Sequence, residues 1–296
     1  MIRPVRFGYN EQTAASNAFQ DLKLKGLEVQ EQALREFEDF QRLLEDNGIQ
    51  VMVIEDTPEP YTPDSIFPNN WISTHSDGSI FLFPMAAANR RDERRQDIVD
   101  LLRERYYIKE IVDLTAFEDE GRFLEGTGSM VLDRENKITY ACISPRTDEF
   151  VLKKFAEKSG YRHVCFHSAD SKGRAIYHTN VMMSVGTGFA LVCLDSIASE
   201  EERNLLTSTL LLTDKEIIKL SLEQIRHFAG NMLELRNNRG EKLLVMSDQA
   251  FESLAPEQIK RLEKYCRIVH SPLTTIESTG GGSARCMIAE IHLPLP

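Results

Sequence analysis

Residues 126–143 read GTGSMVLDRENKITYACI, and this stretch contains the pattern that decides the fold. Small polar residues open it, the β-prone run MVL follows, and the turn residues DREN precede a second β-prone run, ITYACI. Two such runs joined by turn residues predict a β-hairpin. The same arrangement occurs at 71–83, 181–194 and 232–246, and a degenerate fifth copy opens at 280–286 and continues into MIAEIHL.

These hairpins form a repeat of roughly even spacing. With Asn70, Ser129, Asn180, Asn231 and Cys286 as anchors, the spacings are 59, 51, 51 and 55 residues. A hairpin plus a helix at even spacing predicts a radial α/β repeat of five units, as in propeller-like folds. Equivalent strand ends converge on the axis of such a ring, so we expect the five anchor segments to meet at one place. No linker divides the chain, which predicts a single domain over the whole sequence, 1–296.

Helices are expected between the hairpins, because apolar residues recur there at helical spacing. A serine three residues before the start of the last predicted helix, Ser253, is expected to serve as its cap. The predicted helices span Glu28–Asp46, Asn89–Arg105, Asp148–Lys158, Ser199–Leu211, Leu222–Phe228 and Pro256–Tyr265.

Composition limits the classes of function. The net charge of −11 disfavours binding to nucleic acid, whose phosphates are also negative. The N-terminus has no apolar signal region and no stretch approaches the ~20 apolar residues of a membrane span, so we expect a cytoplasmic protein without a membrane partner. Five cysteines without close pairing argue against a disulfide framework, and no CxxC or CxxH spacing suggests a metal site. A homo-oligomer is left open.

Four residues at repeat openings could carry chemistry together. Cys286 ends the glycine-rich run GGGSARC, His178 stands in YHTN, Glu125 in FLEGTGS and Asp64 in TPDSIFPNNW. Each alone has a structural explanation, as a turn residue or a strand-edge histidine. Together they supply a nucleophile, an acid/base group and two carboxylates for a substrate with several N–H donors. This set needs no metal or organic cofactor.

These motifs resemble the guanidino-group-modifying superfamily of arginine deiminases, dimethylarginine dimethylaminohydrolases and amidinotransferases. The resemblance spans nearly the whole chain and implies a five-bladed α/β-propeller, the pentein fold, built of ββαβ-type repeats. The stretches TAASNAFQ and PDSIFPNNW resemble most closely the bacterial citrulline-utilisation hydrolase branch. The matching motifs are Pro63–Phe67, Glu125–Gly128, His178–Asn180 and Gly280–Cys286.

The resemblance also implies roles for individual residues. Cys286 is expected to be the nucleophile, with His178 and Glu125 as further catalytic residues. Asp64 resembles the substrate-binding aspartate of the superfamily. In the dimethylarginine branch, two arginines hold the substrate carboxylate, and their positions correspond to Arg90 and Arg146 here. The match to Arg90 needs a one-residue shift, so its neighbour Arg91 is an alternative.

Asn70 and Asn180 depart from the relatives that process arginine, which tend to have aspartates there. A guanidinium is a cation with N–H donors only, whereas a neutral ureido group also has an oxygen that accepts hydrogen bonds. Amides therefore favour a ureido substrate, and we expect hydrolysis of citrulline to ornithine, ammonia and carbon dioxide through a covalent cysteine intermediate.

Three alternatives remain open at this stage. The first is a hydrolase of arginine or methylarginine, the second an amidinotransferase, and the third a binding protein on the same fold without catalysis. A nucleotide-dependent enzyme is disfavoured, because no GxGxxG follows a strand and no GxxxxGK(S/T) occurs. Arg285, beside the nucleophile, could bind a carboxylate, lower the thiol pKa or face solvent.

Overall fold

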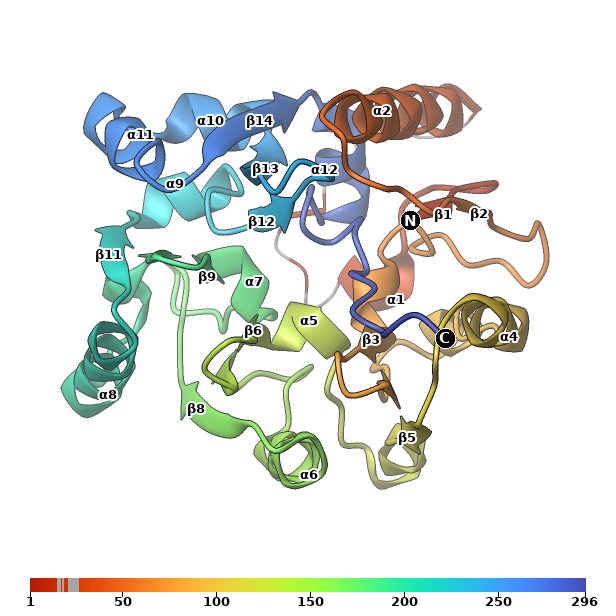
Figure 1. Cartoon of the computed structure of the whole chain (residues 1–296), viewed down its shortest axis with the longest axis horizontal. Helices are drawn as coiled ribbons and strands as arrows, with labels where there is room; N and C mark the ends of the chain where they lie inside the picture. Colours follow the sequence, from red (N-terminus) through yellow and green to blue (C-terminus); the bar gives the residue numbers. More distant parts are fainter. Residues whose placement is uncertain (15–16, 18, 21–26) are drawn as a thin grey trace.

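Four units of the chain follow one plan, a hairpin, a helical segment and a third strand that returns parallel to the second (Figure 1). The computed structural model describes residues 1–14, 17, 19–20 and 27–296, so positions 15, 16 and 18 of TAASNAFQ lie outside the described residues. The strand triplets are β3 Ile72–Thr74, β4 Ser79–Leu82 and β5 Glu110–Asp113; β6 Val131–Asp133, β7 Ile138–Cys142 and β8 Arg162–Phe166; β9 Met183–Val185, β10 Phe189–Val192 and β11 Glu216–Lys219; and β12 Leu233–Arg236, β13 Lys242–Ser247 and β14 Arg267–Ser271.

The helices that cross from the second to the third strand lie on the rim of the ring (Figure 1). Within the part of the chain that the structure describes, they are α3 Ala88–Arg91 with α4 Gln96–Arg105, α6 Glu149–Ser159, α8 Glu200–Leu212, and α10 Asp248–Ser253 with α11 Pro256–Leu262. A further helix, α9 Leu222–Arg226, precedes the fourth hairpin. Side-chain caps begin several of them: Asp148 accepts from Phe150 N at 2.9 Å and Ser199 from Glu202 N at 3.3 Å.

The fifth unit differs from the prediction. The prediction of a fifth hairpin after Cys286 is wrong, because residues 281–296 contain no strand. The fifth sheet instead comes from the N-terminal part, where β1 (Ile2–Arg3) pairs in parallel with β2 (Ile54–Glu55) across α2 (Leu27–Asp46). The C-terminal segment runs beside the first hairpin, where His292 N donates to Thr74 Oγ1 at 2.7 Å. Segments from both chain ends therefore complete the ring.

Local details also differ from the sequence prediction. The predicted helix Asn89–Arg105 is broken between α3 and α4. Ser253 is the last residue of α10, and α11 begins after Ala255 instead, so the cap prediction was wrong. The hairpin openings are short helical segments, which hydrophobic alternation does not signal. They are η1 Pro68–Asn70, α5 Gly126–Ser129 and α7 Thr179–Met182.

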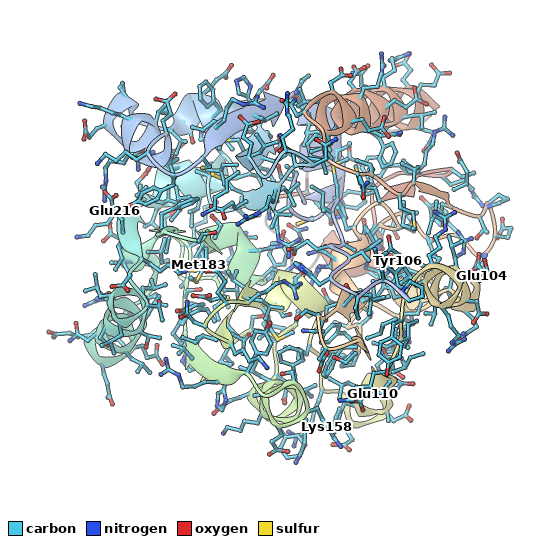
Figure 2. All side chains as sticks on the ribbon, viewed as in Figure 1. Glu104, Tyr106, Glu110, Lys158, Met183 and Glu216 are labelled. Atoms are coloured by element: carbon cyan, nitrogen blue, oxygen red, sulfur yellow. The ribbon has the colours of Figure 1, made fainter. Side chains whose placement is uncertain are left out.

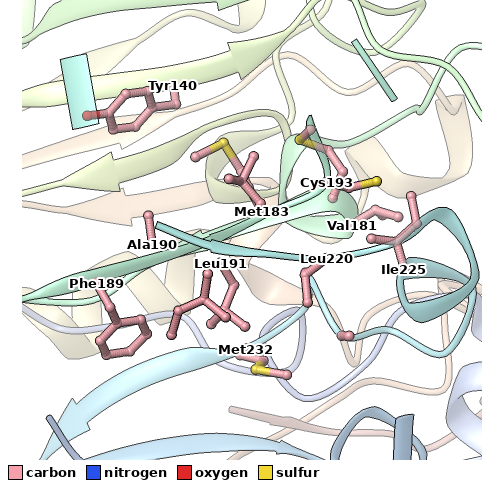
Figure 3. Close-up of a cluster of buried hydrophobic side chains, with 14 of the residues drawn as sticks. Tyr140, Val181, Met183, Phe189, Ala190, Leu191, Cys193, Leu220, Ile225 and Met232 are labelled. Carbon is pink, nitrogen blue, oxygen red and sulfur yellow. The ribbon is translucent and has the colours of Figure 1, made fainter. Parts of the chain in front are cut away.

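The core lies between neighbouring units. Figure 3 shows Phe189 and Leu191 of β10 gathered with Met232, and all three side chains are buried. In Figure 2, Met183 lies toward the centre of the ring, whereas Lys158 lies at its periphery. The middle strands β7 and β10 are buried along their whole length, which fixes their units against the neighbouring ones. Among the described residues, no helix has both the length and the apolar character needed to span a bilayer.

Candidate active site

The short helices α5 and α7 and the turn η1 meet at the centre of the ring (Figure 1), as the repeat predicted for the anchor segments. Thr179 Oγ1 donates to Ser129 O at 2.5 Å, which joins α7 to α5. Gly126 has φ +45°, and a Cβ there would lie 2.3 Å from Asn69 O. Only glycine tolerates this approach and this backbone conformation. The small residues of the openings therefore allow the segments to come together.

Cys286 is buried beside two amide side chains. Its Sγ atom accepts hydrogen bonds from Asn180 Nδ2 at 3.4 Å and from Asn231 Nδ2 at 3.3 Å. Asn231 also donates to Asn180 O at 3.0 Å and accepts from Arg285 N at 3.0 Å. The two amide N–H groups point at the sulfur, where they can stabilise negative charge that develops on it during a reaction. Asn231 was missed as a site residue, although its place as the fourth repeat anchor was a signal that could have identified it.

His178 and Glu125 form a buried pair, with His178 Nε2 2.8 Å from Glu125 Oε2. Burial lowers the pKa of His178 to about 4, although Glu125 acts in the opposite direction, so the imidazole is neutral at pH 7. Burial alone would raise the pKa of Glu125, but Arg146 and His178 outweigh it and hold this pKa well below the usual range. Glu125 is therefore an ionised carboxylate that orients His178 and stabilises its protonated form.

Asp64 lies across the cavity from this pair. Its Oδ2 atom accepts from Asn10 Nδ2 at 2.8 Å and from Thr13 Oγ1 at 3.2 Å. Its Oδ1 atom is buried and has no hydrogen-bond partner among the described residues. Burial raises the pKa of Asp64, while Arg90 lowers it. A buried carboxylate oxygen without a partner is an acceptor that a substrate N–H group could satisfy.

Arg90 is held by protein groups on every side. Its Nε and Nη2 atoms donate to the two carboxylate oxygens of Glu93 at 2.8 and 2.9 Å, and Nη2 also approaches the carbonyl oxygens of Asp64 and Phe67. Its Nη1 atom donates to Asn70 Oδ1 at 2.7 Å. A guanidinium has donors only, so this contact fixes which end of the Asn70 amide faces Arg90. No pattern in the sequence indicated Glu93 as a partner of Arg90.

The orientation of Asn70 leaves a donor near the His178–Glu125 pair. Its Nδ2 atom is buried without a hydrogen-bond partner among the described residues. A Cβ at Gly128 would meet both this Nδ2 atom, at 2.4 Å, and the His178 ring, at 2.8 Å. Asn70 and His178 therefore lie against the same glycine, and Asn70 presents an N–H donor where an acceptor could bind.

A small cavity joins these groups. Six of the eight predicted site residues line it: Asp64, Asn70, Arg90, Arg146, His178 and Cys286. Glu125 lies behind His178. The cavity measures about 20 Å³, which is room for about one water molecule.

The N-terminal segment closes the cavity. Thr13 and Asn17 line it, and Asn17 Nδ2 donates to Gly281 O at 3.3 Å. Arg146 Nη2 donates to Thr13 O at 2.8 Å. Because a free amino acid is much larger than this cavity, residues that line it must move before one can bind.

Two residues beside Cys286, Asn180 and Arg285, line a second and larger opening of about 1000 Å³. The Arg285 guanidinium donates to Ile288 O at 2.9 Å and pairs with Glu290 at 3.0 Å. Its side chain therefore belongs to this second opening, whereas its backbone N–H donates to Asn231, which contacts the Cys286 sulfur.

Comparisons with known proteins agree with this architecture. The family described as N,N dimethylarginine dimethylhydrolase, eukaryotic, matches residues 3–293. A search of curated proteins found no match. Among solved structures, the N-terminal domain of ArgZ, bound covalently to a reaction intermediate, superposes with a TM-score of 0.77 at 16% identity, over 100% of this chain and 98% of that chain.

Two further structures place the chain among its relatives. Apo ArgZ, an arginine dihydrolase from the ornithine–ammonia cycle in cyanobacteria, gives a TM-score of 0.78 at 15% identity and covers 100% of this chain, which spans only 40% of that protein. Dimethylarginine dimethylaminohydrolase, as an adduct with S-methyl-L-thiocitrulline, gives 0.63 at 14% identity, over 97% of this chain and 96% of that chain. The predicted pentein fold is confirmed.

Proposed function

This chain belongs to the N,N-dimethylarginine dimethylhydrolase family, and from that premise we propose that it hydrolyses a carbon–nitrogen bond at the central carbon of a guanidino or ureido group in a free amino acid. The observation that carries the proposal is the meeting of Cys286, the His178–Glu125 pair and Asp64 around one closed cavity. The family supports the superfamily predicted from the motifs. The narrower placement in the bacterial citrulline-utilisation branch stays a prediction.

In the proposed reaction, the Cys286 sulfur attacks the central carbon and forms a carbon–sulfur bond. Neutral His178 accepts the thiol proton, and Glu125 stabilises the resulting imidazolium. The imidazolium then protonates the departing nitrogen as its bond to carbon breaks. In the second half, His178 takes a proton from water, whose oxygen attacks the same carbon and displaces the sulfur. Asn180 and Asn231 stabilise the thiolate as it forms and as it leaves.

The remaining residues bind the substrate in this proposal. Asp64 Oδ1 accepts N–H groups of the reacting end and places its carbon near the sulfur. Arg146, buried against the Tyr177 ring and close to Glu125, holds the amino-acid carboxylate. Arg90 was predicted for the same task, but Glu93 already binds it through two contacts. We assign Arg90 instead to the orientation of Asn70 and Asp64.

The identity of the amino acid has two candidates. The family description names dimethylarginine, and the similar ArgZ is described as an arginine dihydrolase, so a guanidino substrate has the support of the comparisons. The predicted citrulline substrate is the second candidate, and the Asn70 Nδ2 donor favours it, because a ureido oxygen can accept this hydrogen bond and a guanidinium cannot.

A product assay tests the proposal. The protein is incubated separately with arginine, dimethylarginine and citrulline without added metal, and ornithine, citrulline, ammonia and dimethylamine are quantified by mass spectrometry. The intact protein mass is measured after rapid acid quench to detect an adduct on Cys286. Turnover of one of these compounds with an adduct that is absent in Cys286→Ser supports the proposal. No turnover and no adduct with any of them would refute it, and transfer to an added amine would show an amidinotransferase.

A further inference from the structure

Glu277 is a buried carboxylate next to the turn that carries the nucleophile. It lies in α12 (Thr274–Gly280), which runs directly into residues 281–286. Only 1% of Glu277 is exposed, and its Oε1 atom accepts from Ser283 Oγ at 2.5 Å. Its Oε2 atom accepts from Gln249 Nε2. No cation pairs with it within the described part of the chain, although buried carboxylates are ordinarily paired.

Glu277 is linked to Cys286 through Ser283. The Ser283 carbonyl accepts the backbone N–H of Cys286 at 2.9 Å, and the Glu277 carbonyl accepts from Gly281 N at 2.9 Å. Ser283 is completely buried, so no solvent competes for its hydroxyl. Glu277 therefore contacts the turn twice, through its carbonyl at Gly281 and through its carboxylate at Ser283, which holds the Cys286 backbone.

The surroundings of Glu277 favour titration near neutral pH. Burial raises the pKa of Glu277 to about 7, while hydrogen bonds from Ser247, Ser283 and Gln249 act in the opposite direction. The negative charge of Glu36 in α2 raises its pKa further. Glu36 itself caps the start of α12, where its carboxylate accepts from the backbone N–H groups of Thr275 and Ile276.

We propose that Glu277 is a positioning residue whose ionised carboxylate holds Ser283, and through it the Cys286 backbone, in the reactive arrangement. The proposal rests on the function proposed for Cys286 as the nucleophile. A hydrogen bond to an ionised acceptor is roughly twice as strong as one to a neutral acceptor. Protonation of Glu277 therefore loosens the turn, and we expect an effect of about fivefold on the reactivity of Cys286.

The test measures Cys286 alkylation by chloroacetamidine across the pH range, in wild type and in Glu277→Gln, with the labelled cysteine identified by peptide mass spectrometry. The thiol's own ionisation raises the rate in both proteins. We expect the wild-type to variant rate ratio to rise about fivefold between about pH 6 and about pH 8, on either side of the Glu277 pKa. A constant ratio would overturn the proposal. This readout needs no turnover, so its failure is distinct from failure of the proposed hydrolysis.

Two further variants separate positioning from general stability. Glu36→Gln alters the other buried carboxylate at α12, which does not touch Ser283. This variant should keep the pH-dependent rise in Cys286 alkylation rate that comes from Glu277. The rise should occur at lower pH, because the negative charge of Glu36 no longer raises the pKa of Glu277. Ser283→Ala removes only the hydroxyl that joins Glu277 to the turn. This variant should lose the rise in alkylation rate that Glu277 ionisation adds near pH 7, and it provides the test even if Glu277→Gln does not fold. The same rise in Ser283→Ala as in wild type would contradict the proposal.

Discussion

Replacing Asn70 with Asp tests how the site distinguishes ureido from guanidino groups. The new carboxylate can still accept from Arg90 Nη1, which lies 2.7 Å from Asn70 Oδ1, so the surrounding structure should be kept. The side chain loses its only donor, Nδ2, and presents an acceptor to the cavity instead. A ureido oxygen would then face a carboxylate oxygen, whereas a guanidinium would gain a counter-charge.

The magnitude follows from the cost of leaving a buried acceptor without its donor, about 1–3 kcal/mol. At 1.36 kcal/mol for each factor of ten, Asn70→Asp should lower kcat/KM for citrulline about 5- to 150-fold relative to that for arginine or dimethylarginine. The assay measures both values for wild type and variant and compares their ratio.

Asn69→Asp is the matched control. Asn69 is the buried neighbour, its Nδ2 atom donates to Thr127 Oγ1 at 3.3 Å, and it does not line the cavity. This variant could alter stability but should leave the substrate ratio unchanged. An unchanged ratio in Asn70→Asp, with the variant folded, would refute the argument from the orientation of the Asn70 amide.

Three other changes test separate parts of the structure. Cys286→Ser should abolish both turnover and the covalent adduct seen by intact mass, and retained turnover would exclude this nucleophile. Glu125→Gln should lower kcat about 10²- to 10⁴-fold and lower the pKa of His178 further below about 4, because the carboxylate that raises it is lost; an unchanged kcat–pH profile would contradict the orienting role. Asp148→Ala should lower the free energy of unfolding by about 1 kcal/mol in urea titrations without affecting kcat/KM, since the Asp148 side chain caps α6 and does not line the cavity.

The predicted site residues follow largely from the repeat. His178 and Asn70 stand at the openings of equivalent hairpins, and Cys286 holds the fifth anchor position although no hairpin follows it. A radial fold brings such positions together regardless of their separation in the chain. Glu93, Asn10 and the closing segment at Thr13 were not predicted, because nothing in their local sequence differs from that of ordinary polar surface residues.

The sequence by itself determined the unit of the fold, its roughly even spacing and the chemical groups at each opening, because hairpin alternation and turn residues act over a few neighbouring positions. Only the tertiary structure decided how the ring closes, with β1 and β2 in place of a fifth hairpin. It also decided that Arg90 donates hydrogen bonds to Glu93 and that a further hydrogen bond from Arg90 orients the Asn70 amide. These outcomes depend on contacts between atoms from segments far apart in the chain. Which acceptor binds which donor is determined only when the units pack together.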